Sequence, residues 1–331
     1  MRFQTNYLNL WSFALLLSIV ISCKQSTSTD VTPADLSCQV QAINAVGVEF
    51  GTTFTTGTAF NYDAKGQLTS VVESNSNTTG NPTSRTTETY TYDNSGYQTA
   101  YKYVYTYPGY SDDTDNYTYE YTNGRLSKQT DQATTSYLQA TYTGTYTYDA
   151  AGALTQLLSS TAGKITLGGI TTAYTNSFTA LYANGMLTVQ KVLVNGKETA
   201  TYTVENGRIT TETSSDGTKT RYTYDAGGYQ TKKELLTASG TVTSSTTTEY
   251  GATPAPKSVY PASKGFPVYQ PYYGNNDRVV SRVSTTSGGK LSDDYQYQYQ
   301  LNSKGYPTKA TRKNAVINST RTTTYTYANC Q

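Results

Sequence analysis

The 331-residue chain carries a formal net charge of only +2, and 15% of its residues are charged. Its lysines and arginines are dispersed, so no basic face argues for nucleic-acid binding. The chain has no histidine, which excludes Ser-His-Asp and Cys-His catalysis and the usual catalytic zinc sites. Tyrosine dominates the aromatic residues, with 34 Tyr against 7 Phe and 1 Trp, and together with abundant threonine it favours half-exposed β-strands.

The N-terminal segment has the pattern of an export signal. Arg2 precedes an apolar stretch over 8–21, which is short for a membrane span and typical of a signal peptide. The sequence Val-Ile-Ser-Cys at 20–23 resembles the bacterial lipobox, in which the cysteine is diacylated and becomes the mature N-terminus. We therefore predict a signal peptide over 1–22 and a lipidated Cys23 that begins a flexible polar tether over 23–36. The alternative is a simple signal peptide with a chance cysteine.

Two further cysteines, Cys38 and Cys330, stand at the two ends of the remaining chain. Disulfide bonds persist in the oxidising compartments that exported proteins reach. We predict that Cys38 and Cys330 are bonded, which would place the first and last strands side by side. The alternative is a pair of unrelated buried thiols.

A tyrosine-rich unit recurs along the chain with the form Tyr-x-Tyr-Asp-x-x-Gly. Close copies lie at 90–97, 146–153 and 222–229, and looser copies lie at 60–66 and 299–305. In each copy an Asp or Asn precedes a Gly by three positions, which is typical of a type I turn followed by a left-handed glycine. The predicted turn pairs are Asp63 and Gly66, Asp93 and Gly96, Asp149 and Gly152, Asp225 and Gly228, and Asn302 and Gly305.

Shorter turns alternate with these units. Dipeptides that favour two-residue type I′ hairpins occur at 123–124, 184–185, 195–196, 206–207 and 216–217. From Asn184 to Asp225 the turns recur about every ten residues, so the chain reverses direction at each one. This rhythm predicts an all-β fold for 37–331: one large antiparallel up-and-down meander of roughly 16 to 20 strands, rolled into a barrel-like or coiled sheet.

The strands alternate with period two. Tyr101, Tyr103 and Tyr105 share one face, as do Tyr117 and Tyr119, and the intervening positions are mostly threonine or other small polar residues. One face is therefore expected to carry a lattice of tyrosines and the other to face water. A barrel surface in contact with lipid needs an apolar band, so this pattern argues against a transmembrane barrel.

One irregular region, 251–277, holds five of the nine prolines. Proline excludes it from central strands, and a loop of this length is usually functional or a linker. Its aromatic residues are candidates for stacking on sugar rings; the alternative is a plug or crossover that buries them against the tyrosine face. The candidate ligand-binding residues are Tyr260, Phe266, Tyr269, Tyr272 and Tyr273.

Three acidic residues gather at Asp112, Asp113 and Asp115. Clustered carboxylates can hold calcium, but this spacing lacks the glycine and the distant glutamate of an EF-hand. We expect an acidic hairpin loop there and no metal site.

The repeated unit resembles the YD repeat of RHS-type proteins, whose β-sheets coil into shells, and its combination with a lipobox resembles lipoproteins of the Bacteroidetes group. Some families there, of unknown function, are described as having a porin-like fold. The resemblance covers most of residues 57 to 327 and implies a large rolled sheet or barrel. It brings no catalytic residues, and the toxin and autoprotease portions of full RHS proteins are missing.

The sequence thus predicts a non-enzymatic, cofactor-free outer-membrane lipoprotein of the cell envelope, held to the membrane by its lipid and facing either side. Glycans or envelope polymers are the favoured ligands because tyrosine offers a flat apolar ring with a polar tip. One alternative is a structural scaffold that contacts another envelope protein. Another is a hydrolase that uses two carboxylates, because 23 Asp and Glu residues are available.

Overall fold

The computed structural model describes residues 38–49, 52–76, 82–184, 186–256, 258, 260, 263–267, 277–328 and 330. Cys23 and the tether lie outside these residues. The described chain folds into β-strands: β1 Gln39–Glu49, β2 Thr52–Tyr62, β3 Leu68–Ser76, β4 Pro82–Tyr92, β5 Gln98–Thr106, β6 Asp113–Thr122, β7 Arg125–Thr134, β8 Leu138–Tyr148, β9 Leu154–Leu167, β10 Ile170–Ala183, β11 Met186–Val194, β12 Lys197–Glu205, β13 Arg208–Ser214, β14 Lys219–Tyr224, β15 Gln230–Leu236, β16 Val242–Pro254, β17 Arg278–Ser287, β18 Lys290–Leu301, β19 Pro307–Asn314 and β20 Ser319–Ala328.

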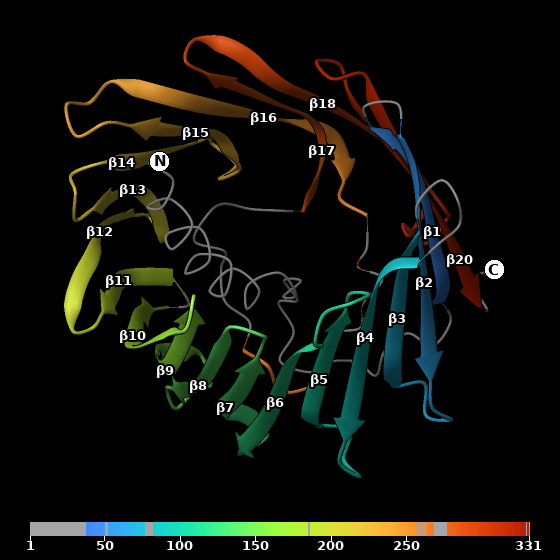
Figure 1. The fold of residues 1–331 in the computed structure, drawn as a ribbon, viewed down its shortest axis with the longest axis horizontal. Helices are drawn as coiled ribbons and strands as arrows, with labels where there is room; N and C mark the ends of the chain where they lie inside the picture. The colour runs from blue at the N-terminus through green and yellow to red at the C-terminus, as the bar shows by residue number, and fades with distance from the viewer. Residues whose placement is uncertain are drawn as a thin grey trace.

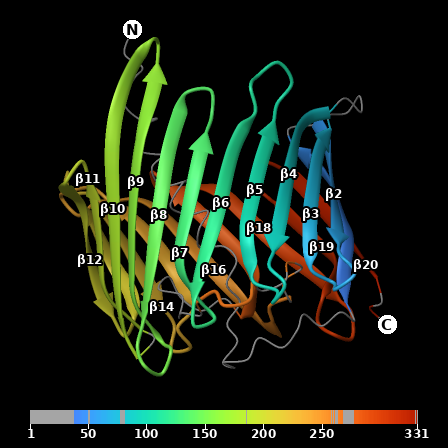
Figure 2. The same cartoon turned by 90° about the horizontal axis from the view of Figure 1, so that it is seen from below.

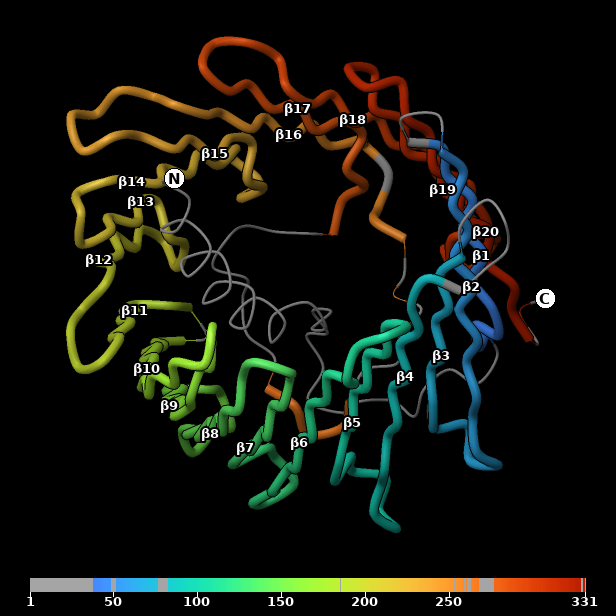
Figure 3. The backbone as a smooth tube through the Cα atoms, in the orientation of Figure 1, coloured from blue at the N-terminus to red at the C-terminus, as the bar shows by residue number. Residues whose placement is uncertain are grey.

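All the strands belong to one 20-stranded sheet that closes into a barrel. Neighbours in sequence pair antiparallel, as in β8 with β9, where Tyr146 lies opposite Leu157. The ring closes because β1 pairs with β2 on one side and with β20 on the other. The backbone can be followed around the ring in chain order (Figures 1 and 3). The predicted up-and-down meander is confirmed. Of the two forms that the sequence left open, a barrel and a coiled sheet, the pairing of β1 with β20 shows a closed barrel.

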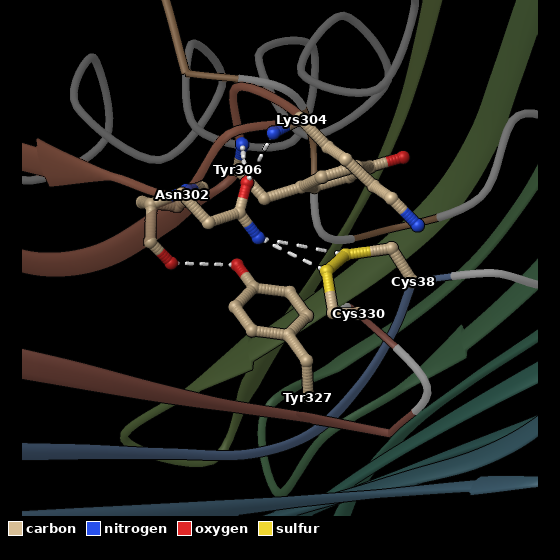
Figure 4. The surroundings of a disulfide bond; sticks show 7 residues. Cys38, Asn302, Lys304, Tyr306, Tyr327 and Cys330 are labelled. Atoms are coloured by element: carbon tan, nitrogen blue, oxygen red, sulfur yellow. Dashed lines mark hydrogen bonds between the residues drawn. A yellow bond between two sulfur atoms is a disulfide. The ribbon is translucent and has the colours of Figure 1, made fainter.

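Neighbouring strands run in opposite directions. Every connection from an even-numbered strand to the next odd-numbered strand therefore lies at the same end of the barrel, the lower end in Figure 2. We call it the disulfide end. Cys38 and Cys330 flank the seam between β1 and β20 and form the predicted disulfide bond there. The side-chain nitrogen of Asn302, in the turn between β18 and β19, lies 3.0 Å from the sulfur of Cys330 and 3.8 Å from that of Cys38 (Figure 4).

The Asp-x-x-Gly turns are closed by the aspartate side chain. Asp93 Oδ1 accepts hydrogen bonds from the backbone nitrogens of Ser95 and Tyr97 at 2.8 and 2.9 Å. The nitrogen of Gly96, which has a φ of 86°, donates to the carbonyl of Asp93. The four other copies close in the same way, with Asp63, Asp149, Asp225 or Asn302 as the acceptor.

Three of the five predicted two-residue turns are confirmed, at 123–124, 195–196 and 206–207. The turn at 184–185 includes Gly185, which lies outside the described residues, and the prediction at 216–217 was wrong. Asn123 and Gly124 both have positive φ, 52° and 75°, as a type I′ turn requires. The turn at Asp216 and Gly217 was wrongly predicted as this type. Of this pair only Gly217 has a positive φ, 84°, and its nitrogen donates to the Ser214 carbonyl at 2.9 Å, so the turn has the longer, bulged form. Asp216 Oδ1 accepts from the nitrogen of Thr218 and thereby stabilises that form.

The second tyrosine of the repeated unit makes a contact that explains why tyrosine stands there. Its hydroxyl donates to a backbone carbonyl at the start of the preceding strand, as Tyr148 does to Leu126 at 2.9 Å. We call this contact a tyrosine latch. Equivalent latches join Tyr62 to Val40, Tyr121 to Gln98, Tyr224 to Ile209, Tyr250 to Gln230 and Tyr327 to Pro307.

Removing one latch is expected to cost a modest amount of stability. Tyr148→Phe keeps the ring and deletes the hydroxyl, so we expect the free energy of unfolding to fall by about 1 kcal/mol, the usual net value of one hydrogen bond. Equilibrium denaturation in urea measures this loss. Tyr110→Phe is the matched control because that side chain is 72% exposed in a loop. Equal losses in the two variants would contradict a role for the latch.

The alternating faces of the strands become the inside and outside of the barrel. On β8, Leu138, Ala140, Tyr142 and Tyr146 are buried on the inner face, whereas the outward residues between them are glutamine and threonine. The outer face of β18 and β19 is likewise polar, with glutamine, lysine and threonine in register. This outer face carries no apolar band of the kind that lipid contact requires along these strands. No helix that could cross a membrane occurs in the described residues.

An aliphatic layer lies beneath the tyrosines at the disulfide end, and the sequence interpretation missed it. The inner face was expected to carry a lattice of tyrosines. Instead the position two after the turn glycine often holds an aliphatic side chain that is 3% exposed or less. These residues are Leu68, Leu126, Leu154, Leu187 and Ile209. At Leu126 and Ile209 a latch tyrosine closes over the strand start where the aliphatic residue stands.

The proline-rich insert between β16 and β17 crosses the disulfide end of the barrel. In the ring of 20 strands β6 lies opposite β16, and the insert that follows β16 nevertheless reaches the β6 side. The carbonyl of Gly265 accepts a hydrogen bond from the nitrogen of Leu126 at 2.7 Å, and Lys264 Nζ donates to the carbonyl of Ser95 at 3.0 Å. The orange segment beside β6 in Figure 1 is this part of the insert. Its described residues therefore form the crossover that was one of the two sequence interpretations.

Candidate functional site

The inner face of β3 to β7 brings carboxylates and tyrosine rings together. Strand register places Glu88 of β4 opposite Tyr103 of β5, and Tyr103 opposite Asp115 of β6. One step along, Tyr117 of β6 lies opposite Asp131 of β7. We call this surface the acid–tyrosine wall; it consists of Glu73, Glu88, Tyr90, Tyr101, Tyr103, Asp115, Tyr117 and Asp131.

Rings follow one another across three strands of the wall. The centroids of Tyr90 and Tyr101 lie 5.1 Å apart, and those of Tyr101 and Tyr117 lie 5.2 Å apart. These separations fall in the range in which tilted aromatic pairs attract one another. All three side chains are half-buried, so part of each ring is accessible from the inside of the barrel.

The carboxylates of the wall share hydroxyl donors from the tyrosines. Glu88 accepts a hydrogen bond from Tyr90 and another from Tyr101. Burial raises the pKa of Glu88 in spite of these bonds. Burial also raises the pKa of Asp115, with a smaller contribution from the charge of Asp113. These groups are therefore harder to ionise than free carboxyls.

Asp131 is the most deeply placed acid of the wall, with 4% of its surface exposed. Burial, followed by the charge of Asp115, raises its pKa to about 7. Hydrogen bonds from the Tyr117 hydroxyl and the Asn116 backbone act in the opposite direction. Its Oδ1 atom has no hydrogen-bond partner among the described residues. A buried carboxylate oxygen without a donor is costly, because it has lost its hydration and gained nothing in return.

Positive charge is distributed away from this wall. On the outer face, carboxylates are paired with cations: Lys128 with Glu120 at 2.9 Å and Arg282 with Asp294 at 2.7 Å. On the inner face, Arg312 lies over the ring of Tyr295, and Arg321 of β20 lies over that of Phe54. In the part of the chain that the structure describes, no lysine or arginine forms an ion pair with a carboxylate of the wall.

The insert contributes one ring to the edge of the wall. Tyr260 packs edge-on against Phe60 of β2, with 5.5 Å between ring centroids. Burial raises the pKa of Tyr260, and the charges of Glu88 and Glu73 raise it further, which places the hydroxyl beside these acids. Its side chain is still 39% exposed.

The other predicted insert residues have different positions. Phe266 packs against Tyr119, with 5.1 Å between centroids, and joins the core cluster around Leu126. Its ring is thus in contact with the barrel wall, as a crossover requires. Tyr269, Tyr272 and Tyr273 lie outside the described residues, and so does the lipidation site, Cys23.

The acidic group at 112–115 does not form the simple loop that was expected. Asp113 and Asp115 belong to β6, and Asp115 points to the inner face opposite Tyr103. Within the described residues, no three acids or cysteines gather in a way that could hold a metal ion. Sequence reasoning did not single out Glu73, Glu88 or Asp131. Only Glu88 carried a local signal, because it alternates with Tyr90 on its own strand. The strands of Glu73 and Asp131 contain no tyrosine, so only the strand pairing shows that these acids face the same side.

The chain is similar to known proteins in one segment of its sequence and in its structure. Residues 205–242, from the end of β12 to the start of β16, match the RHS Repeat family, which confirms a YD-type repeat in this segment. A porin-like protein from Bacteroides uniformis is similar in structure, with 15% identity and a TM-score of 0.36 over 87% of this chain and 96% of that chain. A porin-like protein from Bacteroides vulgatus gives 10% identity and a TM-score of 0.33 over 88% and 99%. No curated protein matches the chain. The barrel assignment itself rests on the strand pairing described above.

Proposed function

We propose that this chain is a lipid-anchored, non-enzymatic protein of the cell envelope that binds a glycan or another envelope polymer on the inside of its barrel. The observation that carries the proposal is the acid–tyrosine wall: half-buried rings at about 5 Å from one another, interleaved with carboxylates. Aromatic rings offer flat apolar faces to sugar rings, and carboxylates accept hydrogen bonds from hydroxyl groups.

The direction of the chain supports a tethered barrel. Cys38 lies at the disulfide end, so the 14 residues between Cys23 and Cys38 leave the barrel there. Fully extended, such a segment reaches about 50 Å. In our proposal the lipid holds the disulfide end toward the membrane, the insert crosses that end, and the ligand enters from the opposite end. The polar outer residues of β8, β18 and β19 support a barrel that stands in water beside the membrane.

The test is a binding assay on purified residues 24–331 with a panel of oligosaccharides and envelope polymers. We expect Tyr103→Ala combined with Tyr117→Ala to weaken binding at least tenfold, because about 1 kcal/mol is lost for each ring contact. Tyr110→Ala is the matched control, since this exposed tyrosine lies in the loop between β5 and β6. Isothermal titration calorimetry measures the affinities.

Three outcomes would contradict the proposal. Unchanged affinity in the double variant would move the site away from the wall, and absence of binding to any saccharide would favour the scaffold alternative. Release of new reducing ends during incubation would show a hydrolase instead of a binding protein. Circular dichroism confirms that each variant is folded.

A further inference from the structure

From the charge and geometry of the acid–tyrosine wall we infer a specific ligand class: saccharides that carry free ammonium groups, as de-N-acetylated amino sugars do. This inference rests on the proposed function and goes one step further. The proposed function needs only tyrosine rings and hydrogen-bonding groups. The carboxylates of the wall add negative charge beside the rings, which a cationic sugar would match.

Carboxylates alternate with tyrosine rings across the neighbouring strands of the wall. Glu88 and Asp115 stand on either side of Tyr103, two strands apart, which corresponds to about 10 Å at the usual strand spacing. Asp131 stands beside Tyr117 on the next strand. A ligand lying on the rings therefore meets a carboxylate on each side. An ammonium group in that position would contact both a carboxylate and the face of a tyrosine, which attracts cations.

The wall lacks the cations that balance carboxylates elsewhere in the molecule. Glu120, on the outer face of the same strand as Asp115, is paired with Lys128. No such pair forms on the inner face of β3 to β7 among the described residues. Buried carboxylates are ordinarily paired, because an isolated buried charge is costly. A cationic ligand would supply the missing partner.

Asp131 provides an independent observation. It is 96% buried, two donors reach its carboxylate, and yet Oδ1 has no partner. The groups that face it are Asp115, Tyr117 and Tyr119 from β6 and Tyr142 from β8, and none of them is a cation. An ammonium group offers three charged donors to this acceptor, whereas an N-acetylated amine offers a single neutral N–H donor, which bonds a carboxylate more weakly.

The experiment compares two ligands of the same length and backbone: an oligomer of glucosamine, which has free amines, and the corresponding oligomer of N-acetylglucosamine. Calorimetry is carried out at neutral pH, where the amines keep part of their positive charge and Asp131, with a pKa of about 7, is partly ionised. We expect the free-amine oligomer to bind wild-type protein at least tenfold more tightly. Asp131→Asn and Glu88→Gln should each remove most of this preference, bringing the ratio of the two affinities close to one.

The matched control is Glu120→Gln, which removes a carboxylate from the outer face of β6. It should leave the preference unchanged. If Asp131→Asn does not fold, as judged by circular dichroism, Glu88→Gln at the half-buried position carries the test.

The outcomes separate this inference from the proposed function. Equal affinity for the two oligomers would overturn the amine preference and leave saccharide binding intact. Failure of folded wild-type protein to bind either oligomer, or any other saccharide of the panel, would overturn both. An oligolysine of the same charge that binds as tightly as the glucosamine oligomer would overturn the assignment to a saccharide.

Discussion

Replacement of both bonded cysteines, Cys38→Ser with Cys330→Ser, is expected to lower the free energy of unfolding by about 5 kcal/mol. The disulfide joins residues 292 positions apart and so restricts nearly the whole described chain in the unfolded state. It also fixes the seam at which β1 and β20 close the ring. Equilibrium denaturation of residues 24–331 in guanidinium chloride measures the loss.

The matched control is wild-type protein treated with a reducing agent, which opens the same bond without a substitution. Both samples should lose the same amount of stability. A loss below about 1 kcal/mol would show that pairing of β1 with β20 closes the barrel without help from the covalent bond.

Asp131→Asn is expected to stabilise the free protein at high pH. The pKa of Asp131 is about 7 in the folded chain and about 3.9 in an unfolded chain. Between these values the unfolded chain has released a proton that the folded chain keeps, so the contribution of this group to stability falls as pH rises from about 4 to 7. The variant should therefore exceed wild type by up to about 4 kcal/mol at pH 8 and match it near pH 4.

Urea denaturation at several pH values measures this difference. Asp216→Asn is a useful comparison because hydrogen bonds from Thr218 lower the pKa of Asp216, the opposite direction. The stabilisation from the ionised Asp216 carboxylate is present above the pKa that this group has in the unfolded chain, and it is lost at lower pH. The Asp216→Asn variant should therefore be less stable than wild type at neutral pH. A constant advantage of Asp131→Asn at all pH values would contradict a buried, hard-to-ionise carboxyl.

The effect of Asp131 on stability and its proposed role in ligand binding are connected. In the free protein its ionised form is opposed by burial and by Asp115. An ammonium group bound at Oδ1 would favour the ionised form, so binding would recover part of the stability that this acid removes at neutral pH. Unfavourable buried acids of this kind are found at functional sites more often than elsewhere.

Local features of this protein were determined by its sequence. The spacing from Asp93 to Gly96 specifies a turn because the carboxylate reaches two backbone nitrogens and only glycine adopts the final φ readily. The alternation of tyrosine and threonine specifies which side chains share a face. The number of strands and their order follow from these short-range rules. The Asp216-Gly217 turn departed from prediction because a hydrogen bond to Thr218 favours a longer loop.

Tertiary structure decided the rest. The cysteine pair predicted that the first and last strands lie side by side, but closure of the sheet also needs backbone pairing of β1 with β20, which no local pattern encodes. The path of the insert to β6 likewise needs the ring to exist first. The acid–tyrosine wall depends on register across five strands: Glu73, Glu88, Asp115 and Asp131 are distant in sequence and ordinary in composition, and pairing of their strands brings them onto one inner face. Burial inside the closed ring then raises the pKa of Asp131, because a charge there has lost its water.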